Sequence, residues 1–211
     1  MNIETFIEET KKLGINLTDK QLSQLEKYYN LLIEWNNKIN LTRIIEKEDV
    51  YLKHFYDSLT ISKIINLNNS GSLCDIGTGA GFPGVVLKIV YPNLKVTLVD
   101  SLNKRIVFLN EVIKELELTD IEAIHSRAED IKDKYDIVTS RAVANLKKLS
   151  EYCLPLVKEN GYFIPMKANV EEELIEAKDT IKKLNGTLEK QETFYLPIEE
   201  SIRNILLIKK L

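Results

Sequence analysis

A run of closely spaced glycines constrains the fold of this 211-residue chain more than any other feature. Residues 72–84 have the sequence Ser-Leu-Cys-Asp-Ile-Gly-Thr-Gly-Ala-Gly-Phe-Pro-Gly, which contains four of the eight glycines. Apolar residues stand on both sides of the glycines, and Pro83 suits the first turn of a helix because no N–H donor is needed there. The run therefore predicts a buried strand, a glycine turn and a helix, with backbone N–H groups of the turn open to a ligand.

Strand and helix patterns alternate after this turn. Strands are predicted at residues 95–99, 121–125, 135–139 and 161–166, helices at 103–117, 145–156 and 170–184, and a closing antiparallel pair at 187–196 and 204–209. This alternation predicts an α/β fold with helices on both faces of the sheet. Ligands of such sheets bind beyond the carboxyl ends of the strands, where the strand order reverses.

Helical spacing dominates the N-terminal part. One helix is expected over residues 3–12 with Ile3, Phe6 and Ile7 inward, and a second begins at a capping box, Thr18–Gln21, and ends near residues 36–37. A further helical pair covers residues 47–67. Turn-forming residues at 66–71 then suggest a boundary, so we expect an N-terminal helical extension, 1–68, and an α/β domain, 69–211.

Composition narrows the class of protein. The net charge of −3 argues against a chain that is basic throughout, although a local basic patch stays possible. The two cysteines, Cys74 and Cys153, have no CxxC neighbour, which favours a reducing compartment over disulfides or zinc. No segment approaches the roughly 18 apolar residues of a membrane span, and the acidic N-terminus lacks an apolar signal core. We therefore expect a cytoplasmic protein with no membrane and no metal partner.

Two cofactors fit the glycine turn. Residues 79–84 match the dinucleotide pattern GxGxxG, and Asp100 follows at a distance that suits a ribose, so an NAD(P)-dependent oxidoreductase is one alternative. The other cofactor is S-adenosylmethionine, because Asp75 precedes the glycines and an anion there suits ammonium and sulfonium charge. Asp75 could also merely cap the turn. Ala128 and Glu129, after the third strand, are placed to meet an adenine.

Several motifs together resemble the bacterial small-subunit ribosomal RNA guanine-N7 methyltransferases, also called glucose-inhibited division protein B. They span nearly the whole chain in family order: residues 35–42 (Trp-Asn-Asn-Lys-Ile-Asn-Leu-Thr), 54–58 (His-Phe-Tyr-Asp-Ser), 75–84, 98–105 and 139–142. The resemblance implies a class I S-adenosylmethionine-dependent methyltransferase, Rossmann-like, with an N-terminal helical extension. It also implies methyl transfer to N7 of guanine 527 in the 530 loop of 16S ribosomal RNA, presented as RNA or as a small ribosomal subunit assembly.

The resemblance, with the glycine pattern, assigns the predicted site. The cofactor-binding residues are expected to be Asp75, Gly77, Gly79, Phe82, Asp100, Ser101, Leu102, Ala128, Glu129 and Arg141. No catalytic base is expected, because guanine N7 carries a lone pair and no proton. Contacts with RNA are expected from His54, Lys104, Arg105, Arg141, Lys167 and Arg203, which could line one basic cleft.

Two side observations bear on the reaction. The chain lacks the Asn/Asp-Pro-Pro-aromatic motif of exocyclic-amine methylases, and Cys153 lies in a predicted helix, where core packing is the better interpretation than a nucleophile. A non-catalytic RNA-binding protein with a methyltransferase fold is a further alternative. The presence of Asp75, Asp100 and all the glycines argues against it.

Overall fold

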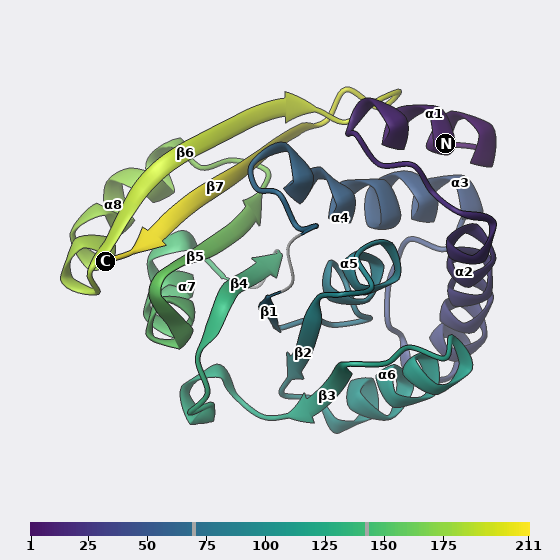
Figure 1. The fold of residues 1–211 in the computed structure, drawn as a ribbon, viewed down its shortest axis with the longest axis horizontal. Helices are drawn as coiled ribbons and strands as arrows, with labels where there is room; N and C mark the ends of the chain where they lie inside the picture. Colours follow the sequence, from purple (N-terminus) through teal and green to yellow (C-terminus); the bar gives the residue numbers. More distant parts are fainter. Residues whose placement is uncertain (69–70, 142–143) are drawn as a thin grey trace.

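The computed structural model describes residues 1–68, 71–141 and 144–211, and within them the chain forms one seven-stranded sheet (Figure 1). Its order is β3-β2-β1-β4-β5-β7-β6. The strands are β1(Ser72–Ile76), β2(Lys95–Asp100), β3(Ile121–His125), β4(Tyr135–Arg141), β5(Val157–Lys167), β6(Gly186–Tyr195) and β7(Ile202–Lys210). β7 runs antiparallel to both neighbours, whereas the pairings among β1 to β5 are parallel. The order reverses between β1 and β4, and a ligand site is expected there.

Helices cover both faces of this sheet, as predicted. One face carries α5(Gly84–Val90) and α6(Asn103–Glu115), and the other carries α7(Leu146–Cys153) and α8(Glu171–Lys183) (Figure 1). Short 3-10 helices follow β3, at η3(Ala128–Asp130), and α7, at η4(Leu154–Leu156). Cys153 is buried in the α7 layer, and burial raises the pKa of its thiol well above its usual value, which agrees with core packing.

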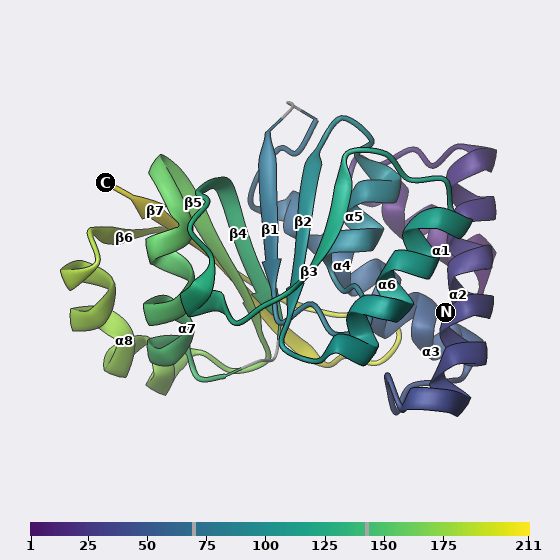
Figure 2. The same ribbon diagram turned by 90° about the horizontal axis from the view of Figure 1, so that it is seen from below.

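The N-terminal helices lie on the same face as α5 and α6 (Figure 2). They are α1(Ile3–Lys12), α2(Asp19–Ile39), α3(Lys47–Val50), the π-helix η1(Tyr51–Tyr56), α4(Asp57–Leu59) and the 3-10 helix η2(Thr60–Lys63). The capping box at Thr18 is present. α2 continues to Ile39, beyond the predicted end, because Asn40 rather than the earlier asparagines adopts the left-handed conformation that ends it, with φ 52°.

One inward-facing residue was predicted wrongly. Ile3 is 39 % exposed, because α1 packs through its second turn, where the ring of Phe6 meets the ring of Tyr51 at 5.2 Å. The same hydrophobic cluster contains residues of α2, such as Leu25, and residues of α5 and α6, such as Val85 and Leu109. The predicted division at residues 68 and 69 stays a prediction, because residue 69 lies outside the described part of the chain.

Candidate active site

The glycine turn runs from the end of β1 to the start of α5. Gly77, Gly79 and Gly81 have φ values of 67°, 62° and 100°, which residues with a side chain rarely adopt. At Gly81 a Cβ would lie only 2.5 Å from the hydroxyl oxygen of Tyr28 and 2.6 Å from Val85 Cγ2, whereas at Gly79 nothing lies nearer than 4.0 Å. Gly81 is therefore needed for packing under α2, and Gly79 leaves open space beside the turn.

Asp75 lies beneath this turn and is fully buried. Its Oδ2 accepts hydrogen bonds from the Thr78 hydroxyl at 2.7 Å and from the Gly84 N–H at 2.9 Å. Its Oδ1 has no hydrogen-bond partner among the described residues. Burial raises the pKa of this carboxyl to about 6. Asp75 thus caps the turn, and it also holds one uncompensated acceptor atom that a cationic group could stabilise.

Asp100, at the end of β2, is 1 % exposed and already holds three donors. Its Oδ2 accepts from the Gly79 N–H at 2.9 Å, its Oδ1 accepts from the Leu102 N–H at 3.0 Å, and Arg105 Nη1 lies 3.1 Å from Oδ2. These donors fix the carboxylate at the mouth of the turn. A ribose diol that binds here would share the carboxylate with Arg105.

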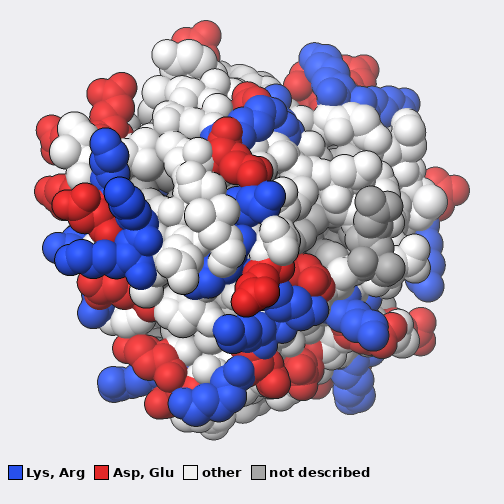
Figure 3. Space-filling view, turned by 60° about the vertical axis from the view of Figure 1, so that its left-hand side comes forward, with Lys and Arg blue, Asp and Glu red and all other residues white. Residues whose placement is uncertain are grey.

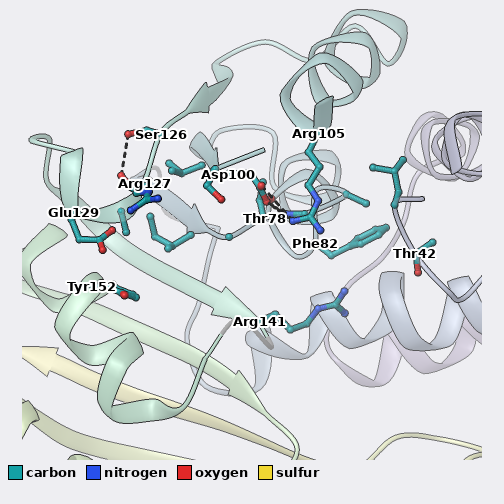
Figure 4. A pocket seen from close by; sticks show the side chains of 18 of the residues that line it. Thr42, Thr78, Phe82, Asp100, Arg105, Ser126, Arg127, Glu129, Arg141 and Tyr152 are labelled. Atoms are coloured by element: carbon teal, nitrogen blue, oxygen red, sulfur yellow. Dashed lines mark hydrogen bonds and ion pairs between the residues drawn. The ribbon is translucent and has the colours of Figure 1, made fainter. Parts of the chain in front are cut away.

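A pocket of about 640 Å³ opens over this edge of the sheet (Figure 4). It brings together ten of the residues predicted from the sequence: His54, Gly77, Gly79, Phe82, Asp100, Ser101, Arg105, Ala128, Glu129 and Arg141. Figure 4 shows Glu129 and Arg127 at one end and Phe82 and Thr42 at the other, with Asp100 between them. A long ligand lying across the strand ends would therefore meet the turn, the acidic residue after β2 and the loop after β3.

A cluster of rings and charges closes the end of the pocket near Phe82. The His54 ring stacks on the Phe82 ring with centroids 4.4 Å apart, and the Arg141 guanidinium lies 5.4 Å from the same ring. Arg141 Nη1 donates to Asp57 Oδ2 and to the Lys53 carbonyl, both at 3.0 Å. Burial, and then the charge of Arg141, lowers the pKa of His54 to about 3, so the imidazole is neutral at physiological pH.

The chain matches a known protein family over most of its length. The family model described as rRNA small subunit methyltransferase G (GidB) matches residues 21–204. A protein of that name from Bacillus subtilis is 52 % identical over 218 residues, covering 100 % of this chain and 91 % of that protein, and one from Bacillus cytotoxicus is 54 % identical over 217 residues with the same coverage. The chain belongs to the rRNA small subunit methyltransferase G family. The family resemblance of the sequence motifs is thereby confirmed.

Solved structures show that this family member has a methyltransferase fold. A SAM-dependent methyltransferase from Aquifex aeolicus superposes with a TM-score of 0.60 at 17 % identity, over 85 % of this chain and 98 % of that chain. TYW2 of M. jannaschii, solved with AdoMet, gives 0.60 at 16 % identity, over 79 % and 77 %. The Rossmann-like class I fold is confirmed. The fold and the family together confirm S-adenosylmethionine as the cofactor. The open side of Gly79, and the Asp75 Oδ1 that has no partner in the described part of the chain, fit a cationic cofactor.

Five predicted residues of this family member lie outside the pocket. Leu102, the residue before α6, and Lys104, on α6, are both exposed, and Asp75 is buried under the turn. Lys167 pairs with Glu173 at 2.7 Å, and Arg203 Nε pairs with Asp57 Oδ1 at 3.1 Å. On the face shown in Figure 3, basic and acidic side chains are interspersed. The single basic cleft expected from the sequence is therefore reduced, within the described residues, to the cations beside the pocket.

The pocket also contains residues that the sequence analysis did not assign. Thr42, Thr78, Ser126 and Tyr152 are among its lining residues. Thr42 ends the motif at residues 35–42, so a signal existed. Tyr152, on α7, carries no local signal. Within the described residues no three His, Cys, Asp or Glu side chains are grouped to hold a metal ion, and no helix has the length and apolarity to span a membrane.

Proposed function

We propose that this chain transfers the methyl group of S-adenosylmethionine to N7 of a guanine in 16S ribosomal RNA, at guanine 527 of the 530 loop as the family resemblance implies. The coarser part of this function, methylation of ribosomal RNA with S-adenosylmethionine, is that of the family to which the chain belongs. The acceptor atom and its position in the RNA are the proposal.

The end of the pocket near Phe82 supports N7 as the acceptor, because it offers no free base near neutral pH among the described residues. A guanidinium has only donors and no acceptor, so Arg141 offers no base. His54 is neutral, but both of its ring nitrogens are already engaged, with Arg141 at 3.2 Å and with Thr42 at 3.0 Å. An exocyclic amine or a hydroxyl acceptor needs a base to take its proton. Guanine N7 presents its lone pair directly and needs none.

The residues of the chain then have separate roles in binding and orientation. Asp100 and the backbone of Gly77 and Gly79 would hold the ribose and the amino-acid part of the cofactor, and Ala128 and Glu129 would meet its adenine. Asp75 would stabilise the positive charge of the cofactor from beneath the turn. Bound S-adenosylmethionine supplies an electrophilic methyl group. Holding that methyl and N7 in line can lower the barrier by about 7–11 kcal/mol through proximity alone.

Contacts with RNA follow the placement of the cations. Arg105 and Arg141 line the pocket, and Lys104 is exposed beside it, so these three are proposed to contact phosphate or the base edge. His54 is proposed to shape the base site through its stack on Phe82. All four of Arg105, Arg141, Lys167 and Arg203 are held in ion pairs within the protein, but Lys167 and Arg203 also lie outside the pocket, so they are the weaker candidates for RNA contact.

A methylation assay tests the proposal. Small ribosomal subunits from a strain that lacks this gene would be incubated with the purified protein and tritiated S-adenosylmethionine. Borohydride and aniline, which cleave RNA at 7-methylguanosine, would then locate the product. We expect one cleavage, at guanine 527, and none with the Gly77→Val variant, because Gly77 has a left-handed φ of 67° that valine adopts only with strain. A methyl group on another atom contradicts the proposed acceptor, and RNA binding without transfer supports the non-catalytic alternative.

A further inference from the structure

Thr42 is held at the pocket by the turn that follows α2. Asn40 ends the helix in the left-handed conformation, and the Asn36 side-chain oxygen accepts the Thr42 N–H at 2.8 Å. These two asparagines therefore pin the turn, and the residue that the turn presents is Thr42. Its hydroxyl oxygen lies 3.0 Å from His54 Nε2. Thr42 lines the pocket at the end occupied by Phe82 and Arg141 (Figure 4).

The direction of each hydrogen bond in this cluster is determined by Arg141. Its Nη2 lies 3.2 Å from His54 Nδ1, and a guanidinium can only donate, so Nδ1 is the acceptor. Asp57 and the Lys53 carbonyl hold the guanidinium in this position. The Lys53 carbonyl also lies 3.2 Å from Nδ1, but a proton on Nδ1 would point two donors, Nδ1–H and Nη2–H, at each other, so this contact is not a hydrogen bond. The neutral imidazole therefore carries its proton on Nε2, and Nε2 donates to the Thr42 oxygen.

The Thr42 hydroxyl is thereby left as a donor. Its oxygen accepts from His54 Nε2 and, at 3.0 Å, from the Ile44 N–H, which uses both lone pairs. Among the described residues its O–H donates no further hydrogen bond. We propose that this O–H donates a hydrogen bond to an acceptor atom of the target base, O6 if the base is guanine. The identity of that atom rests on the proposed function.

The position of Thr42 favours the base over the cofactor as its partner. The groups suited to the cofactor, Asp100 and Glu129, extend away from Thr42 toward the loop after β3 (Figure 4). Phe82 and Arg141 lie on the Thr42 side, which leaves that end of the pocket for the target base (Figure 4). Guanine presents O6 and N7 on one edge, so a donor on O6 can orient the base and leave the N7 lone pair open.

Nuclear magnetic resonance tests the first step, the tautomer of His54. The chain has two histidines, so protein labelled with ¹⁵N-histidine gives two sets of ring signals, and a His125→Asn variant assigns them. Two-bond ¹H–¹⁵N correlations should show His54 protonated on Nε2 and unprotonated on Nδ1 at pH 7. A proton on Nδ1 would make Thr42 the donor to His54, and that result overturns the proposal.

Paired changes in enzyme and substrate test the contact with the base. Thr42→Val removes the hydroxyl at nearly constant shape, and Thr42→Ser keeps it. The substrate would be 16S ribosomal RNA built by ligation with guanine or with 2-aminopurine, which keeps N7 and lacks O6, at the target position. With guanine, the single-turnover rate should fall about tenfold in Thr42→Val, the effect of one lost hydrogen bond of ~1.4 kcal/mol, and less than threefold in Thr42→Ser.

The 2-aminopurine substrate separates recognition from a structural role. Wild-type protein should lose the same contact on this RNA, so Thr42→Val should cause little further loss. A tenfold loss on both RNAs would mean that Thr42 only supports His54, and would overturn the proposal. A matching loss of affinity for S-adenosylmethionine, measured by calorimetry, would assign the hydroxyl to the cofactor and overturn it as well. If the wild-type product carries its methyl on another atom, N7 is not the acceptor and the proposed function fails. The rates at which Thr42→Val and Thr42→Ser form that product then show by themselves whether the Thr42 hydroxyl donates to the target base.

Discussion

Replacing Asp75 with asparagine should change how the free energy of unfolding depends on pH. The wild-type carboxyl is fully buried, and one of its oxygens has no partner among the described residues, so burial raises its pKa to about 6 from 3.8. The folded chain therefore holds this proton to a higher pH than the unfolded chain does. The contribution of Asp75 to the free energy of unfolding should accordingly fall between about pH 4 and pH 6 and become level above pH 6.

The size of the effect follows from the two pKa values. A difference of about two units corresponds to roughly 3 kcal/mol over the whole range, and about 2 kcal/mol of it falls between pH 4.5 and pH 7.5. Asparagine keeps a carbonyl oxygen for the Thr78 hydroxyl and the Gly84 N–H but does not titrate. The stability of Asp75→Asn relative to wild type should therefore increase by about 2 kcal/mol from pH 4.5 to pH 7.5.

Urea unfolding followed by tryptophan fluorescence at pH 4.5, 5.5, 6.5 and 7.5 measures this difference directly. Other titrating groups contribute equally to both proteins and cancel. A difference that stays constant over this range would refute the assignment of a raised pKa to Asp75. The same variant should bind S-adenosylmethionine at least about tenfold more weakly at pH 7.5, because the buried anion that stabilises the cationic cofactor is gone. Unchanged affinity would leave Asp75 as a turn cap only.

Three further outcomes are expected. Gly81→Ala should lower the free energy of unfolding by about 3 kcal/mol or more, because the new Cβ overlaps Tyr28 and Val85 and the backbone is left-handed. Gly79→Ala should cost only about 1–2 kcal/mol, from the left-handed backbone alone. Equal losses in urea unfolding would contradict the close packing around Gly81. Asp57→Ala should cost about 3–5 kcal/mol, because two arginines lose a buried partner, and thermal melts that match wild type would show that the pairs contribute nothing. Single-turnover methyl transfer at saturating S-adenosylmethionine should stay flat from about pH 7 to pH 9, above the Asp75 pKa of about 6, since His54 is neutral throughout. A rate that falls tenfold per pH unit from pH 9 to pH 7 would contradict transfer to N7.

Features that depend on residues close together in the sequence were predictable from the sequence. The strand, glycine turn and helix between residues 72 and 90, the capping box at Thr18 and the place of Asp100 at the end of β2 all follow from local spacing. The reason is that hydrophobic periodicity, backbone freedom and capping act over a few residues. Parallel strands place their carboxyl ends on one edge of a sheet, so most of the predicted cofactor residues do meet in one pocket.

Tertiary structure alone decided which charges are available and which residues complete the site. Arg203 and Arg141 meet Asp57 across 146 and 84 residues of sequence, and no local pattern indicates these pairs. Lys167 was predicted to bind RNA because it lies near a strand end, but its nearest carboxylate comes from α8. The direction of the Thr42 hydroxyl depends on Arg141, far along the chain, through His54. Ion pairs and hydrogen-bond directions are set by which segments pack together, and packing is a property of the whole fold.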